Sequence, residues 1–247
     1  MRPAAIVIGG SRGLGRALAT RLASSGHDLV LTARPSPELG QVAQQLRDEH
    51  GSAVWEVALD LASTDAEAAR RYVSQCCDLL PGLSQVYVTA GATSALDAGA
   101  GSADLFGNLM EVNCLGVSRV VAAFAERLHA RDSSITVVSS IAAARARGRN
   151  LAYAASKAAL ETYVAGLRHH YAGGPMRLQT CRVGYMRTRL TEGQKLRLPL
   201  ADPADVARRI CGWHCDDFGV RYLPVFWYPV AAVLRALPWW LFRRLQF

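Results

Sequence analysis

Short apolar runs alternate with longer amphipathic stretches through most of this chain, and this alternation constrains the fold more than any other feature. The apolar runs are bounded by Gly, Pro or Asp, and they fall at Ala4–Ile8, Asp28–Thr32, Ala53–Ala58, Gln85–Thr89, Ile135–Ser139 and Leu178–Val183. Strands that alternate with helices form βαβ units, whose parallel sheet is covered on both faces. We therefore predict an α/β fold with a doubly wound, mostly parallel sheet of seven strands, the last at Tyr222–Trp227.

The composition fits one globular domain. Of the 247 residues, 51% are hydrophobic, and neither a repeat nor a long linker interrupts them, so we expect one domain at 1–228 and a tail at 229–247. The N-terminus lacks the pattern of a secretory signal. The six cysteines follow no disulfide or zinc spacing, and we interpret Cys211 and Cys215 as helix packing residues instead of metal ligands. The expected location is the cytoplasm.

A glycine-rich turn follows the first apolar run directly and opens a helix. It consists of Gly9, Gly10, Ser11, Arg12, Gly13, Leu14 and Gly15. Glycines at such a turn let the backbone bend tightly and approach a pyrophosphate, which binds the amide groups of the helix N-terminus. The spacing differs from the common G-x-G-x-x-G, and a glycine-rich turn is often only a turn. Its place between a strand and a helix favours a phosphate site on a Rossmann fold.

The end of the second strand indicates which nicotinamide cofactor is preferred. Proteins that prefer NAD usually carry an acid there for the ribose 2′-hydroxyl, whereas this chain has Arg34, and Arg12 stands in the glycine-rich turn. Guanidinium groups favour a 2′-phosphate, because charge-assisted forked hydrogen bonds suit phosphate. We therefore predict NADPH. The alternative is that both arginines are simply solvated.

Tyr153 and Lys157 lie four residues apart, on one face of a predicted helix. A free tyrosine has a pKa of about 10. A neighbouring ammonium group favours the phenolate, which brings the pKa of the tyrosine toward a useful acid–base range. Upstream, a predicted strand ends in Ser139 and Ser140. A Tyr–Lys pair alone is poor evidence for catalysis, since such pairs arise by chance on many helices.

The glycine-rich turn, the two serines, the Tyr–Lys pair and Asn113 together resemble the short-chain dehydrogenase/reductase family in order and spacing, from Ala5 to about Val225. The resemblance implies an oxidoreductase that interconverts a ketone and a secondary alcohol. Tyr153 would donate the proton to the carbonyl oxygen, and Ser140 would hydrogen-bond that oxygen. Lys157 would hold the nicotinamide ribose and lower the pKa of the tyrosine, and Asn113 would hold a water that links Lys157 to solvent.

The same resemblance implies the other contacts with the cofactor. Asp60 would cap the adenine amino group, and Thr188 would anchor the carboxamide. The expected cofactor-binding residues are Gly9, Ser11, Arg12, Gly13, Leu14, Gly15, Arg34, Asp60, Leu61, Ala90, Gly91, Tyr153, Lys157, Gly184 and Thr188. Ile8, Thr89 and Val183 depart from the family pattern, and the first two affect hydrogen bonds that brace the site.

The net charge of +8 comes from one part of the chain. Residues 133–200 hold 11 Lys and Arg against 2 Asp and Glu, and these residues would surround the active site. A cleft lined by one sign of charge concentrates ligands of the other sign. We predict an anionic substrate, such as a phosphate ester, bound by Arg145, Arg147, Arg149 and Arg189. Alternatively, these arginines face water on flexible loops. Nucleic acid is not expected, because aromatic residues are scarce in the basic cluster.

The end of the chain is apolar, aromatic and basic. The run 222–234 is too short and too often broken by proline to cross a bilayer, which takes about 20 residues. Trp239 and Trp240 beside Arg243 and Arg244 suit a peripheral contact with the inner face of a membrane, with aromatic rings at headgroup depth. Packing of the tail on the domain or across a subunit contact explains the same residues equally well.

Three segments, 143–150, 187–189 and 233–245, are also similar to the decaprenylphosphoryl 2-keto-pentose reductases. That similarity implies an anionic keto sugar linked to a polyprenyl phosphate as substrate. The alternatives are a soluble or steroid-like ketone, an acyl-carrier-bound 3-keto substrate, and a non-catalytic regulator that senses NADPH. The wider family also implies a homodimer, formed through the predicted helices Phe106–Ala130 and Leu151–Ala172.

Overall fold

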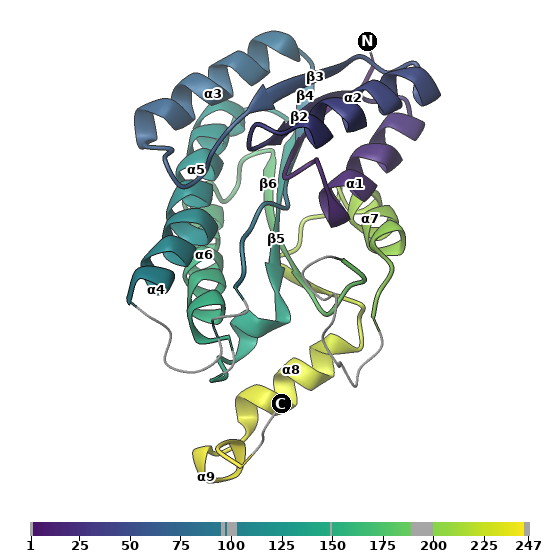
Figure 1. The fold of residues 1–247 in the computed structure, drawn as a ribbon. Helices are drawn as coiled ribbons and strands as arrows, with labels where there is room; N and C mark the ends of the chain where they lie inside the picture. The colour runs from purple at the N-terminus through teal and green to yellow at the C-terminus, as the bar shows by residue number, and fades with distance from the viewer. Residues whose placement is uncertain (1, 95–96, 98–102, 149, 189–199, 245–247) are drawn as a thin grey trace.

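The structure, a computed structural model, describes residues 2–94, 97, 103–148, 150–188 and 200–244 (Figure 1). Within these residues, seven strands form one parallel sheet in the order β3-β2-β1-β4-β5-β6-β7. The strands are β1 (Ala4–Ile8), β2 (Asp28–Ala33), β3 (Val54–Ala58), β4 (Leu83–Val88), β5 (Ser133–Ser140), β6 (Met176–Val183) and β7 (Val220–Leu223). The strand order reverses between β1 and β4, which confirms the predicted doubly wound Rossmann fold.

Helices cover both faces of the sheet (Figure 1). One face carries α1 (Gly13–Ser24), α2 (Pro37–His50) and α7 (Pro203–Gly212), and the other carries α3 (Ala66–Leu79), α4 (Ala103–Met110), α5 (Val117–Leu128) and α6 (Leu151–His170). Two apolar cores result, one on each side of strands such as β1, where all five residues are buried. This burial on both faces explains why β1 is a continuous apolar run.

Local signals set the ends of several helices. Pro37 occupies the first turn of α2, where its missing N–H is not needed, and Gly51 ends the helix in the left-handed region at φ 60°. The Asp65 carboxylate accepts a hydrogen bond from the Ala68 amide at 2.7 Å and caps α3. Such caps fix where each helix starts, and therefore how the loops at the sheet edge are placed.

The predicted helix Phe106–Ala130 is one continuous helical segment with a change of winding inside it. A π-helical turn, η1 (Glu111–Gly116), joins α4 to α5. Gly116 lets the segment after β3 pack closely against this turn, because a Cβ there would overlap the Leu61 carbonyl oxygen. Turns of this kind are frequent at functional sites, and this one contains Asn113.

The predicted last strand, Tyr222–Trp227, is wrong in its boundaries. β7 ends at Leu223, and Trp227 starts α8 (Trp227–Ala236), which is followed by α9 (Trp239–Phe242). The indole of Trp227 is buried over Gly184, where an added Cβ would overlap the ring. The beginning of α8 thus packs on the domain, whereas its later part and α9 extend away from the body (Figure 1). Within the described residues, no helix is long and apolar enough to cross a membrane.

Candidate active site

The sequence-predicted site residues come together at the carboxyl ends of the strands. Gly9 follows β1, Ala90 and Gly91 follow β4, Ser140 ends β5, and Gly184 follows β6. These strands flank the position where the strand order reverses, which is where ligands bind in open α/β sheets. Chain segments that are distant in the sequence therefore lie together at one edge of the sheet.

The glycine-rich turn has the tight geometry that the sequence predicts. Gly9 has φ 94° and Gly13 has φ 52°, values that favour glycine, and a Cβ on Gly15 would overlap the Gly9 carbonyl oxygen. The turn leads into α1, whose first turn holds no acidic residue and has no side-chain cap. The amides of this helix N-terminus are thus available to an anion, and the turn fits the diphosphate of a dinucleotide.

Thr89, which departs from the family pattern, braces the turn. Its hydroxyl donates to the Ile8 carbonyl oxygen at 2.9 Å, and the amides of Thr89 and Ala90 donate to the same oxygen at 2.8 and 3.0 Å. Ile8 itself is buried in the core. The hydrogen bonds that the sequence left in question are therefore supplied by Thr89 and by the backbone.

The other expected cofactor residues differ in their surroundings and in their exposure. The side chain of Thr188 is adjacent to Gly13, at 3.4 Å from the position of an added Cβ. Asp60 is exposed and accepts a hydrogen bond from the Ala62 amide at 3.1 Å, whereas the neighbouring Leu61 is buried. Ser11 is partly exposed, and Leu14 packs in the core under α1.

The four expected catalytic residues converge. Ser140 is hydrogen-bonded to the Tyr153 phenol. Lys157 is 3% exposed, and its ammonium donates to the Val138 carbonyl oxygen at 3.4 Å. A Cβ on Gly91 would lie 3.0 Å from the Lys157 nitrogen and 3.3 Å from Asn113 Oδ1. Gly91 therefore leaves open the space between the ammonium and the amide.

Burial dominates the ionisation of the Tyr–Lys pair. It raises the pKa of Tyr153 above the ordinary value of 10.0, while the hydrogen bond with Ser140 acts to lower it. Burial also lowers the pKa of Lys157 from 10.5 to about 8, against the opposing charge of Glu161. The phenol is thus protonated at neutral pH, which is the form that can donate a proton.

Asn113 is fixed by hydrogen bonds on both sides of its amide. Oδ1 accepts from the Ala92 amide at 2.7 Å, and Nδ2 donates to the Ala92 carbonyl at 2.8 Å and to the Ser156 hydroxyl at 3.1 Å. Ser156 in turn donates to the Tyr153 carbonyl oxygen at 2.8 Å. The π-helical turn thereby ties the loop after β4 to the first turns of α6.

Asp97 is a site residue that the sequence reasoning missed. Its carboxylate is 1% exposed and accepts hydrogen bonds from the Ala152 amide at 3.0 Å and the Tyr153 amide at 2.8 Å. It therefore caps the N-terminus of α6, the helix that carries Tyr153 and Lys157. The acceptor lies 55 residues from Ala152 in the sequence, so no local capping pattern could have identified it.

The two arginines expected at the 2′-phosphate are on the surface near this turn. Arg34 is exposed after β2, and Arg12 at the N-terminus of α1 forms an ion pair with Glu38 in the first turn of α2. The backbone amide of Glu38 and the Arg12 guanidinium lower the pKa of the Glu38 carboxyl. A carboxylate thus stands beside a predicted phosphate-binding arginine.

The expected substrate arginines have separate environments. Arg147 donates to the Tyr185 hydroxyl at 3.3 Å. Arg145 instead holds the tail, because its guanidinium donates to the carbonyl oxygens of Leu234 at 2.5 Å and Leu237 at 2.6 Å and lies 3.8 Å from the centre of the Phe242 ring. These contacts favour an anchoring role for Arg145 over substrate binding. Arg149 and Arg189 lie outside the described residues.

Comparisons with known proteins agree with this geometry. The family model described as short chain dehydrogenase matches residues 3–197. An uncharacterized oxidoreductase of Mycobacterium tuberculosis is 26% identical over 234 residues, covering 94% of this chain and 91% of the relative. The chain belongs to the short-chain dehydrogenase family, and it is an oxidoreductase of the NAD(P)-dependent kind.

Two solved structures are close in fold. A 3-oxoacyl-[acyl-carrier protein] reductase from Brucella melitensis is 28% identical with a TM-score of 0.79, covering 90% of this chain and 95% of its own. An alcohol dehydrogenase from the archaeon Thermococcus sibiricus, complexed with 5-hydroxy-NADP, is 25% identical with a TM-score of 0.76, covering 89% and 95%. These two neighbours carry the names of different enzymes, so the shared fold does not identify the substrate of this chain.

Proposed function

We propose that this protein is an NADPH-dependent reductase that converts an anionic ketone to a secondary alcohol. The observation that carries the proposal is the convergence of Ser140, a protonated Tyr153 and a buried Lys157 beside a glycine-rich turn that opens a helix with neither an acidic residue in its first turn nor a side-chain cap. The cofactor, when bound, supplies the hydride. Every other step is the work of side chains on this chain.

In this proposal Tyr153 is the general acid. Its O–H bond breaks as the carbonyl oxygen takes the proton, while the carbonyl carbon gains the hydride and the C=O bond becomes C–O. Ser140 orients the oxygen through its hydroxyl, and Lys157 would hold the ribose hydroxyls of the bound cofactor. Asn113 holds the path by which Tyr153 is reprotonated.

The preference for NADPH is assigned to Arg12 and Arg34. The Thermococcus sibiricus neighbour, solved with an NADP derivative, supports the same cofactor here. Isothermal titration of NADPH and NADH tests this assignment. The wild type should bind NADPH at least tenfold more tightly, and the Arg12→Ala/Arg34→Ala variant should lose that preference while NADH binding changes little. The control is Arg16→Ala, which removes an exposed arginine of α1 that donates to Gln45 at 2.8 Å. An unchanged preference in the double variant would refute the assignment.

An anionic substrate is assigned on charge and on Arg147. Arg147 and Tyr185 stand beside the segments that follow Ser140 and Gly184, where a substrate must enter. We expect a phosphorylated ketone to have a kcat/KM at least tenfold above that of its dephosphorylated counterpart, and Arg147→Ala to remove most of the difference. Equal rates for the two ketones would exclude the anionic class. If only a carrier-bound 3-keto substrate reacts, the function resembles that of the Brucella melitensis neighbour.

A peripheral membrane contact is assigned to the tail. Trp239, Trp240 and Tyr228 are 68%, 56% and 63% exposed, and residues 218–247 include four arginines and no acid. Aromatic rings with nearby arginines suit an anionic lipid surface. Co-sedimentation with vesicles that contain an anionic phospholipid should deplete the wild type, and Trp239→Ser/Trp240→Ser should abolish that binding. Equal binding of the variant would show that the tail is not the contact.

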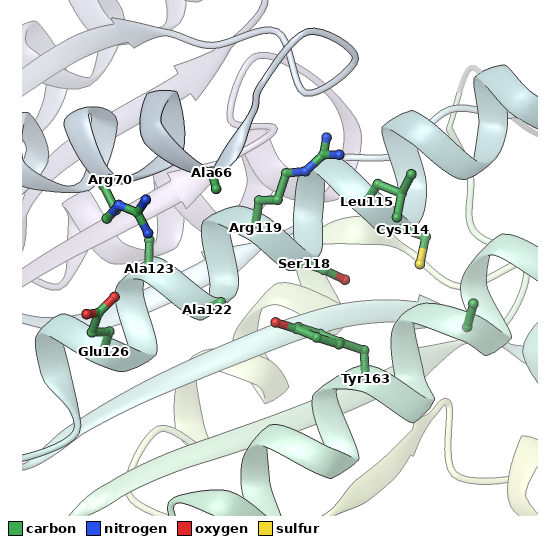
Figure 2. A pocket seen from close by; sticks show the side chains of 11 residues that line it. Ala66, Arg70, Cys114, Leu115, Ser118, Arg119, Ala122, Ala123, Glu126 and Tyr163 are labelled. Atoms are coloured by element: carbon green, nitrogen blue, oxygen red, sulfur yellow. The ribbon is translucent and has the colours of Figure 1, made fainter.

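A homodimer is proposed through α5 and α6. A groove of about 490 Å³ is lined by α5, α6, η1 and the start of α3. Figure 2 shows Arg119 and Tyr163 on its walls and the oppositely charged Arg70 and Glu126 at one end. Leu115 and Tyr163 are about two-fifths exposed there, which favours contact with a second copy. Light scattering should give twice the chain mass, and Tyr163→Glu should give the monomer mass. A wild-type protein with the mass of one chain would refute the proposed dimer.

A further inference from the structure

Two charged side chains are buried one helical turn beyond the catalytic lysine. Glu161 on α6 and Arg182 on β6 have side chains that are each 8% exposed. The Arg182 Nε donates to both Glu161 carboxylate oxygens at 2.9 Å, and its Nη2 donates to Oε2. The remaining Nη1 donates to the Tyr222 hydroxyl on β7. The guanidinium is thus held on two sides.

The strand register explains how this network reaches α6. Arg182 is paired with Ser139 of β5 and with Tyr222 of β7, so these side chains lie on the same face of the sheet. The neighbouring Cys181 and Val183 point to the opposite core, under α1 and α7. Arg182 therefore points toward α6, directly behind the strand end that carries Ser140.

Stability alone does not account for a buried ion pair at this position. Removing two charges from water is costly, and apolar side chains of similar volume often serve a core equally well or better. Burial opposes the charge of Arg182, but the hydrogen bonds and charge of Glu161 outweigh it and raise the pKa of the guanidinium. The position of the Glu161–Arg182 pair beside Lys157 indicates a role other than stability.

Lys157 is surrounded by few charges. Tyr153 and Glu161 lie one turn before and one turn after it on α6, and Cys114 on η1 also acts on its charge. Behind Glu161 lie Arg182 on β6 and Tyr222 on β7. Val138 of β5 contributes a carbonyl oxygen, and Asn113 a neutral amide. Among these described groups, Glu161 is the acid that opposes the effect of burial on Lys157.

We propose that Glu161, oriented by Arg182 and Tyr222, is a positioning residue for the reaction, because its carboxylate stabilises the buried ammonium of Lys157 without capturing it. The inference rests on the proposed function of Lys157 as the group that holds the ribose. Arg182 occupies both carboxylate oxygens, so Lys157 remains directed at the Val138 carbonyl and the open space beside Gly91. A carboxylate freed from Arg182 would instead draw the ammonium away from the site.

The chain offers a direct measurement, since Lys157 and Lys195 are its two lysines. Protein labelled with 13Cε-lysine gives two resonances, and a Lys195→Arg background leaves only that of Lys157. Titration of this resonance should give a midpoint near pH 8 in the wild type. Glu161→Gln should lower the midpoint by about one unit, because the ammonium loses its acid and faces the charge of Arg182. Arg182→Gln should raise it by about one unit, because the freed carboxylate pairs with Lys157.

Opposite shifts distinguish this role from a purely structural one, which would disturb Lys157 in the same sense in both variants. Glu161→Asp retains the carboxylate and should return the midpoint toward the wild-type value. If Arg182→Gln does not fold, the comparison of Glu161→Gln with Glu161→Asp still tests the proposal. Glu126→Gln, at an exposed acid of α5, should leave the midpoint unchanged. A midpoint in Glu161→Gln that stays within about 0.3 unit of wild type, or rises, overturns the proposal.

Activity supplies the second readout. With an active ketone, the pH at which kcat/KM is half-maximal should move in the same direction as the Lys157 midpoint in each variant, with NADPH binding retained. If wild-type protein reduces no ketone, the proposed function fails, while the resonance titration still decides whether Glu161 and Arg182 set the charge state of Lys157. A matched shift in both readouts supports the positioning role, and a resonance shift without a kinetic shift refutes it.

Discussion

Replacement of Asp97 by alanine should weaken the catalytic helix at its first turn. The buried carboxylate accepts hydrogen bonds from the amides of Ala152 and Tyr153, at 3.0 and 2.8 Å. A hydrogen bond to a charged group contributes about 1.5 to 3 kcal/mol, and its loss leaves a buried amide without a partner. Taking the lower figure for each of the two bonds gives a loss of about 3 kcal/mol in the free energy of unfolding, roughly a hundredfold in the folding equilibrium.

The measurement is urea denaturation at neutral pH, with kcat determined in parallel. Asp97→Asn keeps one acceptor oxygen but directs an NH2 group at the other amide. Its free energy of unfolding should therefore fall by about 1.5 kcal/mol, half of the loss in Asp97→Ala. Because the Tyr153 amide belongs to the frayed turn, Asp97→Ala should also lower kcat at least tenfold. The matched control, Asp65→Ala at the exposed cap of α3, should lose less stability and keep wild-type kcat. A loss below about 0.5 kcal/mol in Asp97→Ala would refute the capping role.

Three further perturbations test other parts of the account. The pKa of Lys157 is lowered from 10.5 to about 8 in the folded protein, so the unfolded chain binds more protons between these pH values and stability should rise across this window. In urea denaturation, the free energy of unfolding of the wild type should rise across this window by about 3 kcal/mol more than that of Lys157→Met. If the free energies of the two proteins changed in parallel with pH, the burial of the lysine charge would be contradicted. Gly184→Ala places a Cβ in the Trp227 indole and should cost about 3 kcal/mol with a change in tryptophan fluorescence; a fluorescence spectrum identical to wild type would show that the ring is not there. Arg145→Ala removes the contacts with the Leu234 and Leu237 carbonyls, so limited proteolysis within residues 226–242 should be several-fold faster, and an unaltered cleavage rate would mean that Arg145 does not anchor the tail.

The sequence was sufficient to predict the parallel sheet and to select candidate site residues that the structure brings together. β1 was evident because a strand buried on both faces favours an unbroken apolar run. Gly9 and Gly15 were evident because a turn this tight excludes a side chain at both positions. Tyr153 and Lys157 share a helix, so their spacing alone fixes their common face.

The features that could not be predicted depend on partners distant in the chain. Tyr222–Trp227 is uniformly apolar, and its division into a strand and a helix start depends on Trp227 meeting Gly184. Glu161 and Arg182 look like solvated charges until the register of β6 places one behind the other. Likewise, the position of Arg145 in a basic loop after Ser140 suggested a substrate-binding residue. In the structure its guanidinium donates hydrogen bonds to carbonyl oxygens of the tail instead.

The most direct test of the central claim follows one atom from cofactor to product. NADPH deuterated at the transferable position of the nicotinamide is mixed with the enzyme and a panel of phosphorylated and neutral ketones, and the alcohols are analysed by mass spectrometry. The account predicts deuterium on the carbinol carbon of an anionic product with wild-type enzyme. It also predicts at least a thousandfold slower transfer in Tyr153→Phe, with NADPH binding retained. Transfer at the wild-type rate in Tyr153→Phe, or NADPH binding without transfer to any ketone, would contradict it.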